Sequence, residues 1–373
     1  MFDIADQSDV PQLLRLYRRV YGAGYALPLG TDPEVMSAEI ASAGSIWLVA
    51  RHPADGVIGS IIATVDPSDR LGKLQGLVID PAHRGSGIAR RILGALTDRV
   101  LDSGDVDSVY GTARTTSVAP QRTCLANGFH PLGIFPNLRR ADRHETMVLL
   151  ARYRDGVLDR RIPVERVPSG LAGLIDATAA QIGWADPPEL VPGPEQPTPP
   201  CTDPPTAELV EAPRFVLNRF LEQITDPARR FYPFHAPNMM LVDDGYELYV
   251  HLSRKDGYCA LVGAAPAAMA VAAHLDQTIR QLTDLGAMYV ETLAPLHAFA
   301  ELAELLAHGF TPAAMYPAMR RDGDGFRDYV VMARTIQPLD FRGLAIDAAF
   351  RPFTEQYIQT WTQQYLNTHG VYR

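Results

Sequence analysis

The chain has 373 residues, of which 47% are hydrophobic and 21% charged, and its formal net charge at pH 7 is −9. This length favours about two domains of ordinary globular composition. The acidic balance argues against a general nucleic-acid binder, because no excess of Lys and Arg exists to neutralise phosphates. No apolar run reaches roughly 18 residues, and the N-terminus lacks the pattern of a signal peptide. We therefore expect a soluble, cytoplasmic protein with no membrane segment.

The cysteines predict neither disulfides nor a metal site. Cys124, Cys201 and Cys259 are odd in number and widely spaced, and no two form a CxxC pair. A disulfide framework or a cysteine zinc site needs paired, closely spaced cysteines. We expect no metal.

The first 155 residues alternate between strand-like and helix-like patterns. β-Branched runs and period-3.6 apolar positions distinguish the two kinds of element, and Asp9 and Asp32–Pro33 are typical helix starts. Strands are predicted at 2–4, 45–50, 57–65, 74–79, 108–112, 134–135 and 146–150, and helices after Asp9, after Asp32, over 88–100 and before Asn127–Gly128.

Proline dominates residues 187–205 (PPELVPGPEQPTPPCTDPP). Each proline fixes φ and removes a hydrogen-bond donor, so this segment predicts a connection without regular structure. The stretch before it, 169–184, has some helical periodicity.

An internal repeat links the two halves of the chain. Residues 128–140 read GFHPLGIFPNLRR and residues 309–321 read GFTPAAMYPAMRR, with Gly, Phe, both Pro and both Arg at identical spacing. Similar strand patterns precede and follow both copies. We interpret the chain as two copies of one fold, with domains at 1–155 and 211–340, a helix and proline-rich linker at 156–210, and a helical extension at 341–373.

The segment 77–89 (LVIDPAHRGSGIA) predicts a strand, a tight loop and a helix. A helix N-terminus offers unpaired N–H groups and the positive end of its dipole, and glycines let an anion approach the backbone closely. Such a loop suits a pyrophosphate, although an ordinary strand-turn-helix junction without a ligand is the simpler alternative.

This loop resembles the (Gln/Arg)-x-x-Gly-x-(Gly/Ala) signature of the GNAT acyltransferases, and the order of elements in 1–152 is also similar to theirs. The resemblance implies an α/β (α+β) fold with a mixed, mostly antiparallel sheet flanked by helices, present twice. It also implies acetyl-CoA, or another acyl-CoA, as co-substrate. The implied contacts are the main chain of Leu77, Val78 and Ile79 on the pantetheine side and the loop Arg84, Gly85, Ser86, Gly87, Ile88 and Ala89 on the pyrophosphate.

The catalytic groups are less well defined. Many family members carry a tyrosine acid four residues before a Gly-Phe pair, and here that position is Cys124, which is also a plausible small core residue. Ser117 stands where the family often places a pantetheine-binding Asn, or it caps a helix. Tyr110 is a candidate at the end of its strand, or a core residue. No general base is identified; His83 is expected to face solvent or the cofactor phosphates, and Arg114 an acidic substrate, a CoA phosphate or solvent.

The second copy lacks the loop signature. Its equivalent segment, 262–269 (VGAAPAAM), has one glycine, a proline and no Arg or Gln, and Leu305 stands at the acid position. We predict that this segment opens a helix but no longer binds CoA. Residues 350–373, with aromatic residues every four positions, predict a C-terminal helix.

The sequence therefore predicts an enzyme that moves an acyl group from acyl-CoA to an amine of a small metabolite by direct attack. Two alternatives remain: a non-catalytic acyl-CoA sensor or assembly module, and a protein or peptide N-acetyltransferase. No nucleic acid or membrane is an expected partner, and a homodimer is left open.

Overall fold

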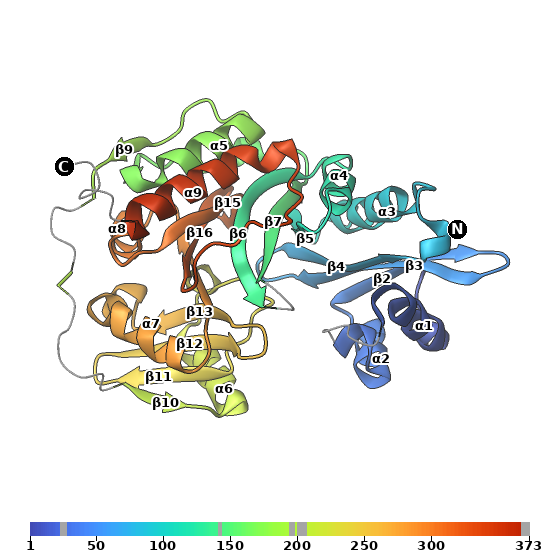
Figure 1. The fold of residues 1–373 in the computed structure, drawn as a ribbon, viewed down its shortest axis with the longest axis horizontal. Coiled ribbons are helices and arrows are strands. Elements are labelled where there is room, and N and C mark those ends of the chain that lie inside the picture. The colour runs from blue at the N-terminus through green and yellow to red at the C-terminus, as the bar shows by residue number, and fades with distance from the viewer. Residues whose placement is uncertain (23–27, 141–143, 194–197, 200–206, 367–373) are drawn as a thin grey trace. The chain divides into compact units, whose positions relative to one another are not determined.

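The computed structural model describes residues 1–22, 28–140, 144–193, 198–199 and 207–366 (Figure 1). The predicted fold class is confirmed, because helices flank a large mixed sheet whose strand pairs are mostly antiparallel. Contacts divide the chain into two compact units. Unit 1 contains Met1–Thr112, Ala119–His130 and Leu150–Asp155, and unit 2 contains Ala113–Val118, Pro131–Leu149 and Gly156–Arg373.

The sheet of unit 1 follows the order β1-β2-β3-β4-β5. Its pairs are antiparallel except for β4 and β5, which are parallel and joined by a helical crossover. Helices α1 and α2 lie on one face of this sheet and α3 and α4 on the other (Figure 1). The elements are β1 (Phe2–Ile4), α1 (Val10–Tyr21), α2 (Pro33–Ala41), β2 (Ser45–His52), β3 (Gly56–Asp66), β4 (Leu71–Ile79), α3 (Ile88–Asp102), β5 (Ser108–Arg114) and α4 (Ala119–Leu125).

The core of unit 1 forms where the apolar side of α1 meets β2, β3 and β4. Tyr17 on α1 and Trp47 on β2 are almost fully buried there, with their rings edge-on at 6.4 Å. Ile62 and Val78 extend the same core on the next two strands. The helical period of α1 and the alternation of the strands place these residues on one side.

The two predicted helix starts have different outcomes. Asp32 caps α2, because its carboxylate accepts the N–H groups of Glu34 and Val35. Asp9 does not cap α1 with its side chain. Its buried carboxylate instead accepts two hydrogen bonds of 2.8 Å from Arg51, which lower its pKa.

Unit 2 holds strands in the order β7-β6-β15-β16-β14-β13-β12-β11-β10, and β8 pairs separately with β9. Helices α5 and α9 pack against each other and against β15. The elements are β6 (His130–Arg140), β7 (His144–Tyr153), β8 (Arg166–Pro168), α5 (Ala172–Ile182), β9 (Glu189–Val191), β10 (Glu208–Val210), α6 (Pro213–Gln223), β11 (Met239–Asp243), β12 (Tyr246–Ser253), β13 (Tyr258–Ala265), α7 (Leu275–Asp284), β14 (Tyr289–Pro295), α8 (Phe299–Ala307), β15 (Thr311–Asp322), β16 (Gly325–Thr335) and α9 (Arg351–Tyr365).

The prediction that the proline-rich segment has no regular structure is wrong for its first part. Glu189–Val191 forms β9, parallel to β8, and Glu189 donates its N–H to Glu165 O at 2.9 Å. Leu190 in this strand is exposed, so the pairing with β8, and not burial of apolar side chains, accounts for β9. The linker residues 194–197 and 200–206, with Cys201, lie outside the described residues, as do 367–373 of the predicted C-terminal helix.

A second correction concerns the segment 262–269. The predicted helix does not begin there, because β13 continues to Ala265 and a 3-10 helix, η8 (Ala268–His274), follows it. The α-helix α7 begins only at Leu275. Its apolar positions match the predicted period, but the proline-containing start forms a tighter turn.

The sequence repeat has a matching backbone geometry. Gly128 and Gly309 have φ values of 76° and 78° where β6 and β15 are about to begin. Nine residues after each glycine, Asn137 and Ala318 adopt φ values of 57° and 48°. Left-handed backbone is uncommon in residues other than glycine, so its recurrence at the same spacing shows that both repeat segments fold alike.

The order of strands also repeats along the chain. Unit 1 has the order β1-β2-β3-β4-β5, with β7 and β6 adjacent in unit 2, and the series from β10 has the order β10-β11-β12-β13-β14-β16-β15. Both series contain one parallel pair, β4 with β5 and β13 with β14. Within unit 2, β6 and β15 pair with Gly133 opposite Ala314, which occupy the same position in the two repeats.

Candidate functional site

The segment after β4 is fixed at its first residue by Asp80. This buried carboxylate accepts the N–H of Ala82 at 3.0 Å and forms an ion pair with Arg19 on α1. The first contact is typical of Asp before a 3-10 turn, here η4 (Pro81–His83). The second joins residues 61 positions apart, so no local pattern could predict it.

Two glycines shape the loop between η4 and α3. Gly85 and Gly87 have φ values of 79° and 75°, a region that side chains other than glycine rarely adopt. A β-carbon built at either glycine would meet no atom within 4 Å. Packing therefore does not demand glycine here; the backbone turn does, and it leaves the outer side of the loop open.

The main-chain amides of this loop are available to a ligand. Among the described residues, no acceptor pairs with the N–H groups of Gly85, Ser86 or Gly87. The N–H groups of Ile88 and Ala89 begin α3 and have no partner within the helix. The Ser86 hydroxyl donates to His83 O at 2.6 Å, within the loop. Consecutive free amides at a helix N-terminus form an anion-binding site.

Arg84 lies at the start of the predicted loop, and Ile88 and the half-buried Ala89 lie at its end, in the first turn of α3. Arg84 is exposed, and its N–H makes a long contact of 3.4 Å with Pro81 O. Ile88 is buried and anchors the first turn of α3, which closes with a bond of 3.1 Å from Arg91 N–H to Gly87 O. The helix is thus held in the core while the loop faces solvent.

Strand β4 carries a bulge just before the predicted pantetheine-binding residues. Ser60 faces Val78 and Ile62 faces Gln75, so two residues of β4, Gly76 and Leu77, lie opposite a single residue of β3. Gly76 has a φ of 66°. A bulge of this kind bends the strand and changes the direction of its main-chain groups.

The edge of β4 that faces β5 opens beyond the bulge. The ladder between the two strands runs only from Leu71–Ser108 to Lys73–Tyr110. Asp80 donates its N–H to Ile58 O on β3 at 2.8 Å, and successive residues of a strand direct their main-chain groups to opposite edges. The main-chain groups of Ile79 therefore point to the open edge.

Cys124 lies on α4 in unit 1, and its residue is half-buried. Burial raises the pKa of its thiol to about 12. An ordinary thiol has a pKa of about 8.5, so this group is a weaker acid than the thiol that CoA would release. Its environment favours a packing role.

Tyr110 and Ser117 occupy different environments. Tyr110 is buried and forms the last pair of the β4–β5 ladder. Ser117 is exposed in the segment between β5 and α4.

Arg114 is partly exposed to solvent and also has an ion-pair partner. In unit 2 it forms an ion pair with the buried Glu145, which also accepts a hydrogen bond of 2.7 Å from Arg139. The two arginines share one carboxylate, so their charge is partly neutralised.

His83 was expected to face solvent or the cofactor phosphates, but its ring points to another side chain. Its Nε2 lies 3.0 Å from Asp55 Oδ2, and only 21% of its side chain is exposed. Sequence reasoning missed this contact because Asp55 lies 28 residues earlier, in the turn between β2 and β3.

The counterpart of the loop in unit 2 is packed rather than open. A β-carbon built at Gly263 would lie 2.7 Å from Ile224 Cδ1 and 3.3 Å from Phe220 Cε2. Gly263 is thus a close-packing residue within β13, unlike Gly85 and Gly87.

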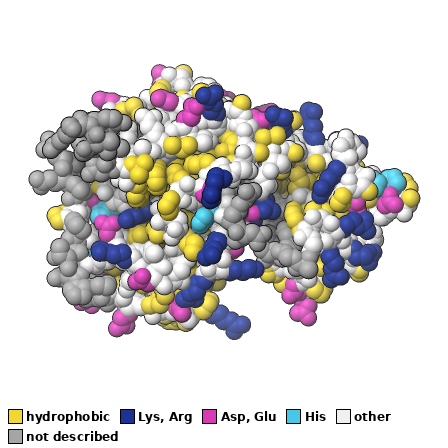
Figure 2. Space-filling view, in the orientation of Figure 1, with side chains coloured by type: hydrophobic (Ala, Val, Ile, Leu, Met, Phe, Trp, Pro, Cys, Tyr) yellow, Lys and Arg dark blue, Asp and Glu magenta, His cyan; other side chains and the backbone are white. Residues whose placement is uncertain are grey.

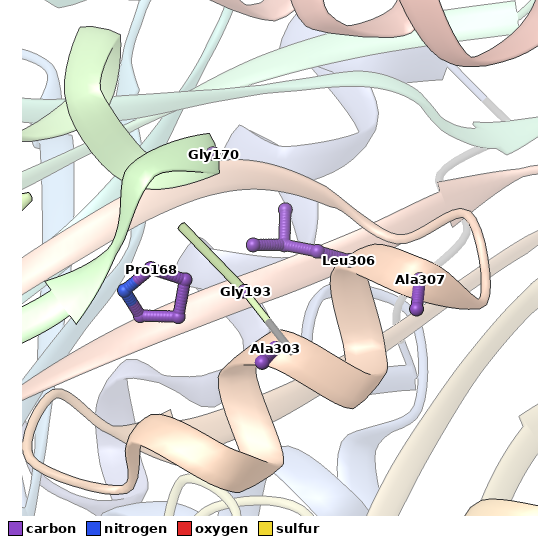
Figure 3. Close-up of a pocket in the computed structure, with 6 residues that line it drawn as sticks. All are labelled: Pro168, Gly170, Gly193, Ala303, Leu306 and Ala307. Atoms are coloured by element: carbon purple, nitrogen blue, oxygen red, sulfur yellow. The ribbon is translucent and has the colours of Figure 1, made fainter. Parts of the chain in front are cut away.

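A pocket of about 290 Å³ lies in unit 2 beside α8 (Figure 3). Its lining side chains are small or aliphatic, and Leu306 extends toward Gly170. None of them carries a charged or nucleophilic group, so this pocket supplies no chemistry. The lining residues are Pro168, Gly170, Gly193, Ala303, Leu306 and Ala307.

Comparison with known proteins finds a family match in the first part of the chain. Residues 10–121 match the acetyltransferase (GNAT) family. This range includes β4, the open loop with its two left-handed glycines, and α3.

Similar solved structures bear the names of acetyltransferases, at low identity. The ribosomal-protein-S18-alanine N-acetyltransferase of Escherichia coli is 15% identical, with 41% of this chain and 93% of that chain covered and a TM-score of 0.36. A spermidine N-acetyltransferase mutant of Vibrio cholerae is 14% identical, with coverages of 41% and 95% and a TM-score of 0.36. A ribosomal-protein-alanine N-acetyltransferase of Brucella melitensis is 17% identical, with coverages of 41% and 99% and a TM-score of 0.37. No curated protein matches the chain.

Two further observations concern the surface and the helices of the described chain. The face seen in Figure 2 carries basic, acidic and hydrophobic side chains interspersed. No helix in the described part of the chain is both long and apolar enough to cross a membrane.

Proposed function

We propose that this chain is an acyl-CoA-dependent N-acyltransferase whose acyl donor binds at Arg84–Ala89 and whose acceptor is an amine of a small metabolite. The observation that carries the proposal is the open loop at the start of α3, with two left-handed glycines and a run of unpaired amides. Its position in the GNAT-matching region agrees with a pyrophosphate ligand.

The chain's own groups would divide the work of direct acyl transfer. The amides of Gly85–Ala89 and the exposed Arg84 would hold the pyrophosphate. The main chain of Ile79, at the open edge of β4, would position the pantetheine arm and polarise the thioester carbonyl. The neutral amine nitrogen would attack the carbonyl carbon, and collapse of the tetrahedral species would break the C–S bond. The proton lost by the nitrogen would be balanced by protonation of the departing thiolate, so that the products are an amide and the CoA thiol.

We also propose that residues 211–340 are a second GNAT-like copy that does not bind the cofactor. The repeated strand order and the left-handed residues Asn137 and Ala318 support the duplication. The packed Gly263 and the 3-10 helix after β13 favour the loss of the anion site. One acyl-CoA per chain is the expected stoichiometry.

Calorimetry with acetyl-CoA tests the loop assignment. Gly87→Glu places a carboxylate against the pyrophosphate, and we expect the Kd to rise at least tenfold. Gly156→Glu is the matched control, because Gly156 also has a left-handed φ, 74°, and open space around it. The control should keep the wild-type Kd. Equal affinity of wild type and Gly87→Glu would contradict the assignment.

A non-catalytic acyl-CoA sensor is the second candidate, because the tyrosine acid is replaced by a thiol of raised pKa, Cys124. Thiol release should be measured with acetyl-CoA and a panel of amines. The panel should include spermidine and a peptide with an N-terminal alanine, which also tests the protein or peptide alternative. Binding of acetyl-CoA without turnover of any amine would favour the sensor.

A further inference from the structure

Two histidines and one aspartate converge at the surface of unit 1. His52 Nδ1 lies 2.9 Å from Asp55 Oδ2, and His83 Nε2 lies 3.0 Å from the same oxygen. The two imidazole rings lie 4.9 Å apart at an angle of 49°. One ligand atom from each residue lies within 4.8 Å of the others.

The turn between β2 and β3 holds the first two residues in place. His52 pairs with Gly56 across the end of the ladder, and Gly56 adopts a φ of 71° that closes the turn. Val57 donates its N–H to Gln12 Oε1 at 3.0 Å, which ties the turn to α1. His52 and Asp55 are therefore presented side by side by a short, braced hairpin.

His83 is positioned independently, by the 3-10 turn that follows β4. It is the last residue of η4, and its N–H donates to Asp80 O at 2.9 Å. Asp80 is itself buried and paired with Arg19. Two separately anchored segments thus direct three ligand-type side chains to one point.

The two printed spacings, 2.9 Å and 3.0 Å, are close to those around a tetrahedral ion, and the two imidazole nitrogens lie within 4.8 Å of each other. Zinc binds imidazole nitrogen at roughly 2.0–2.1 Å and carboxylate oxygen at roughly 2.0–2.2 Å, so neighbouring ligands lie about 3.3 Å apart. The distances from His52 and His83 to Asp55 are a few tenths of an ångström shorter than the ligand–ligand distance around zinc. Small side-chain rotations can provide this extra separation. We propose that His52, Asp55 and His83 form a binding site for one zinc-class divalent ion.

The remaining coordination position would face water. The exposed fractions of the His52 and Asp55 side chains are 42% and 53%, so an ion held there keeps a solvent ligand, as in open three-ligand zinc sites. Figure 2 shows histidine side chains beside acidic ones at the surface near the end of the β2–β3 turn in Figure 1. Two imidazoles and one carboxylate favour zinc, copper or nickel over magnesium and calcium, which prefer oxygen ligands.

The test uses the full chain, freed of any affinity tag and treated with a chelator. Calorimetric titration with ZnCl₂ should show one ion per chain, and CoCl₂ should produce the visible absorption of tetrahedral cobalt. His52→Ala and His83→Ala should each weaken zinc binding at least tenfold and abolish the cobalt bands. A large excess of MgCl₂ should not displace the zinc.

His297→Ala is the matched control, because His297 is exposed and outside the cluster, and it should bind zinc as the wild type does. Thermal unfolding of each variant in chelator checks that the fold is retained; Asp55→Asn, which keeps the size of the side chain, provides a further variant. Absence of zinc binding by the wild type, or equal binding by the double variant His52→Ala/His83→Ala, would overturn the proposal and leave the cluster as a surface ion pair.

Discussion

At the scale of single residues, the thiol of Cys124 gives the sharpest prediction about catalysis. Its pKa is raised to about 12 by burial, so proton donation to a released CoA thiolate is unfavourable. We expect Cys124→Ala to retain most of the wild-type kcat in a thiol-release assay. Cys124→Ser controls for the loss of volume. A fall beyond about a hundredfold, as for a general acid, with unchanged acetyl-CoA affinity would show that the thiol does act.

A second residue, Glu291 on β14, makes stability depend on pH. It is buried, accepts hydrogen bonds from Tyr258 (2.7 Å) and Tyr289 (2.8 Å), and burial raises its pKa to about 7. Because the unfolded chain releases this proton at a pH of about 4.3, the stabilisation is complete below that pH and is lost as the pH rises through 7.

Denaturant unfolding of the wild type and Glu291→Gln at pH 5 and pH 8 checks this dependence. The free energy of unfolding of the wild type, relative to the variant, should fall between these pH values by on the order of 2 kcal/mol. A difference that does not change with pH would show that Glu291 ionises normally.

Residue patterns predicted local contacts far better than distant ones. The tight loop within 77–89 and its glycines Gly85 and Gly87 were predicted, because such features depend on immediate neighbours. The ion pair of Asp80 with Arg19 and the contact of His83 with Asp55 join separate elements. Their formation depends on how α1 and the β2–β3 turn pack on β4, which no spacing in the sequence encodes.

At the scale of elements, the bulge of β4 should be the most sensitive backbone feature near the site. An alanine at Gly76 would have a strained left-handed φ, and its β-carbon would lie 2.5 Å from the Tyr17 hydroxyl, which now donates to Gly76 O. We expect Gly76→Ala to lower the free energy of unfolding by about 2–3 kcal/mol and to weaken acetyl-CoA binding severalfold.

Gly104→Ala separates strain from packing in this experiment. Gly104 has a φ of 79°, and a β-carbon there would only touch Arg154 at 4.0 Å. We expect Gly104→Ala to lower the free energy of unfolding by about 1 kcal/mol through backbone strain alone. The affinity for acetyl-CoA should not change. Equal losses for the two variants in chemical denaturation would mean that Tyr17 and β3 accommodate the added methyl group.

Most elements followed from periodicity, and the exceptions have physical causes. The helices α1 and α3 and the strands of unit 1 have long, regular apolar patterns, so their positions were predicted closely. Strand β9 was missed because prolines flank it on both sides, and it exists only through pairing with β8. The start of α7 was placed too early because apolar residues continue through a 3-10 turn.

At the scale of the whole molecule, the contact between β6 and β15, through equivalent positions of the two repeats, can be tested by mutation. A β-carbon at Gly133 would overlap Ala314 and the carbonyl of Ala313, so Gly133→Ala should lower the free energy of unfolding by about 2 kcal/mol or more. Adding Ala314→Gly should recover part of that loss. A double-mutant cycle by denaturant unfolding measures the recovery, and strict additivity of the two changes would deny that these positions contact each other.

The pairing of Gly133 with Ala314 has a consequence for how such a chain can evolve. In a symmetric dimer, a residue beside the two-fold axis faces its own copy, and every mutation there appears on both sides at once. When two copies lie in one chain, each side changes alone. A glycine can then face an alanine, a pairing that identical subunits cannot offer. Under the proposed duplication, the same freedom would allow one copy to keep a glycine loop for an anion while the other fills that place with packed side chains.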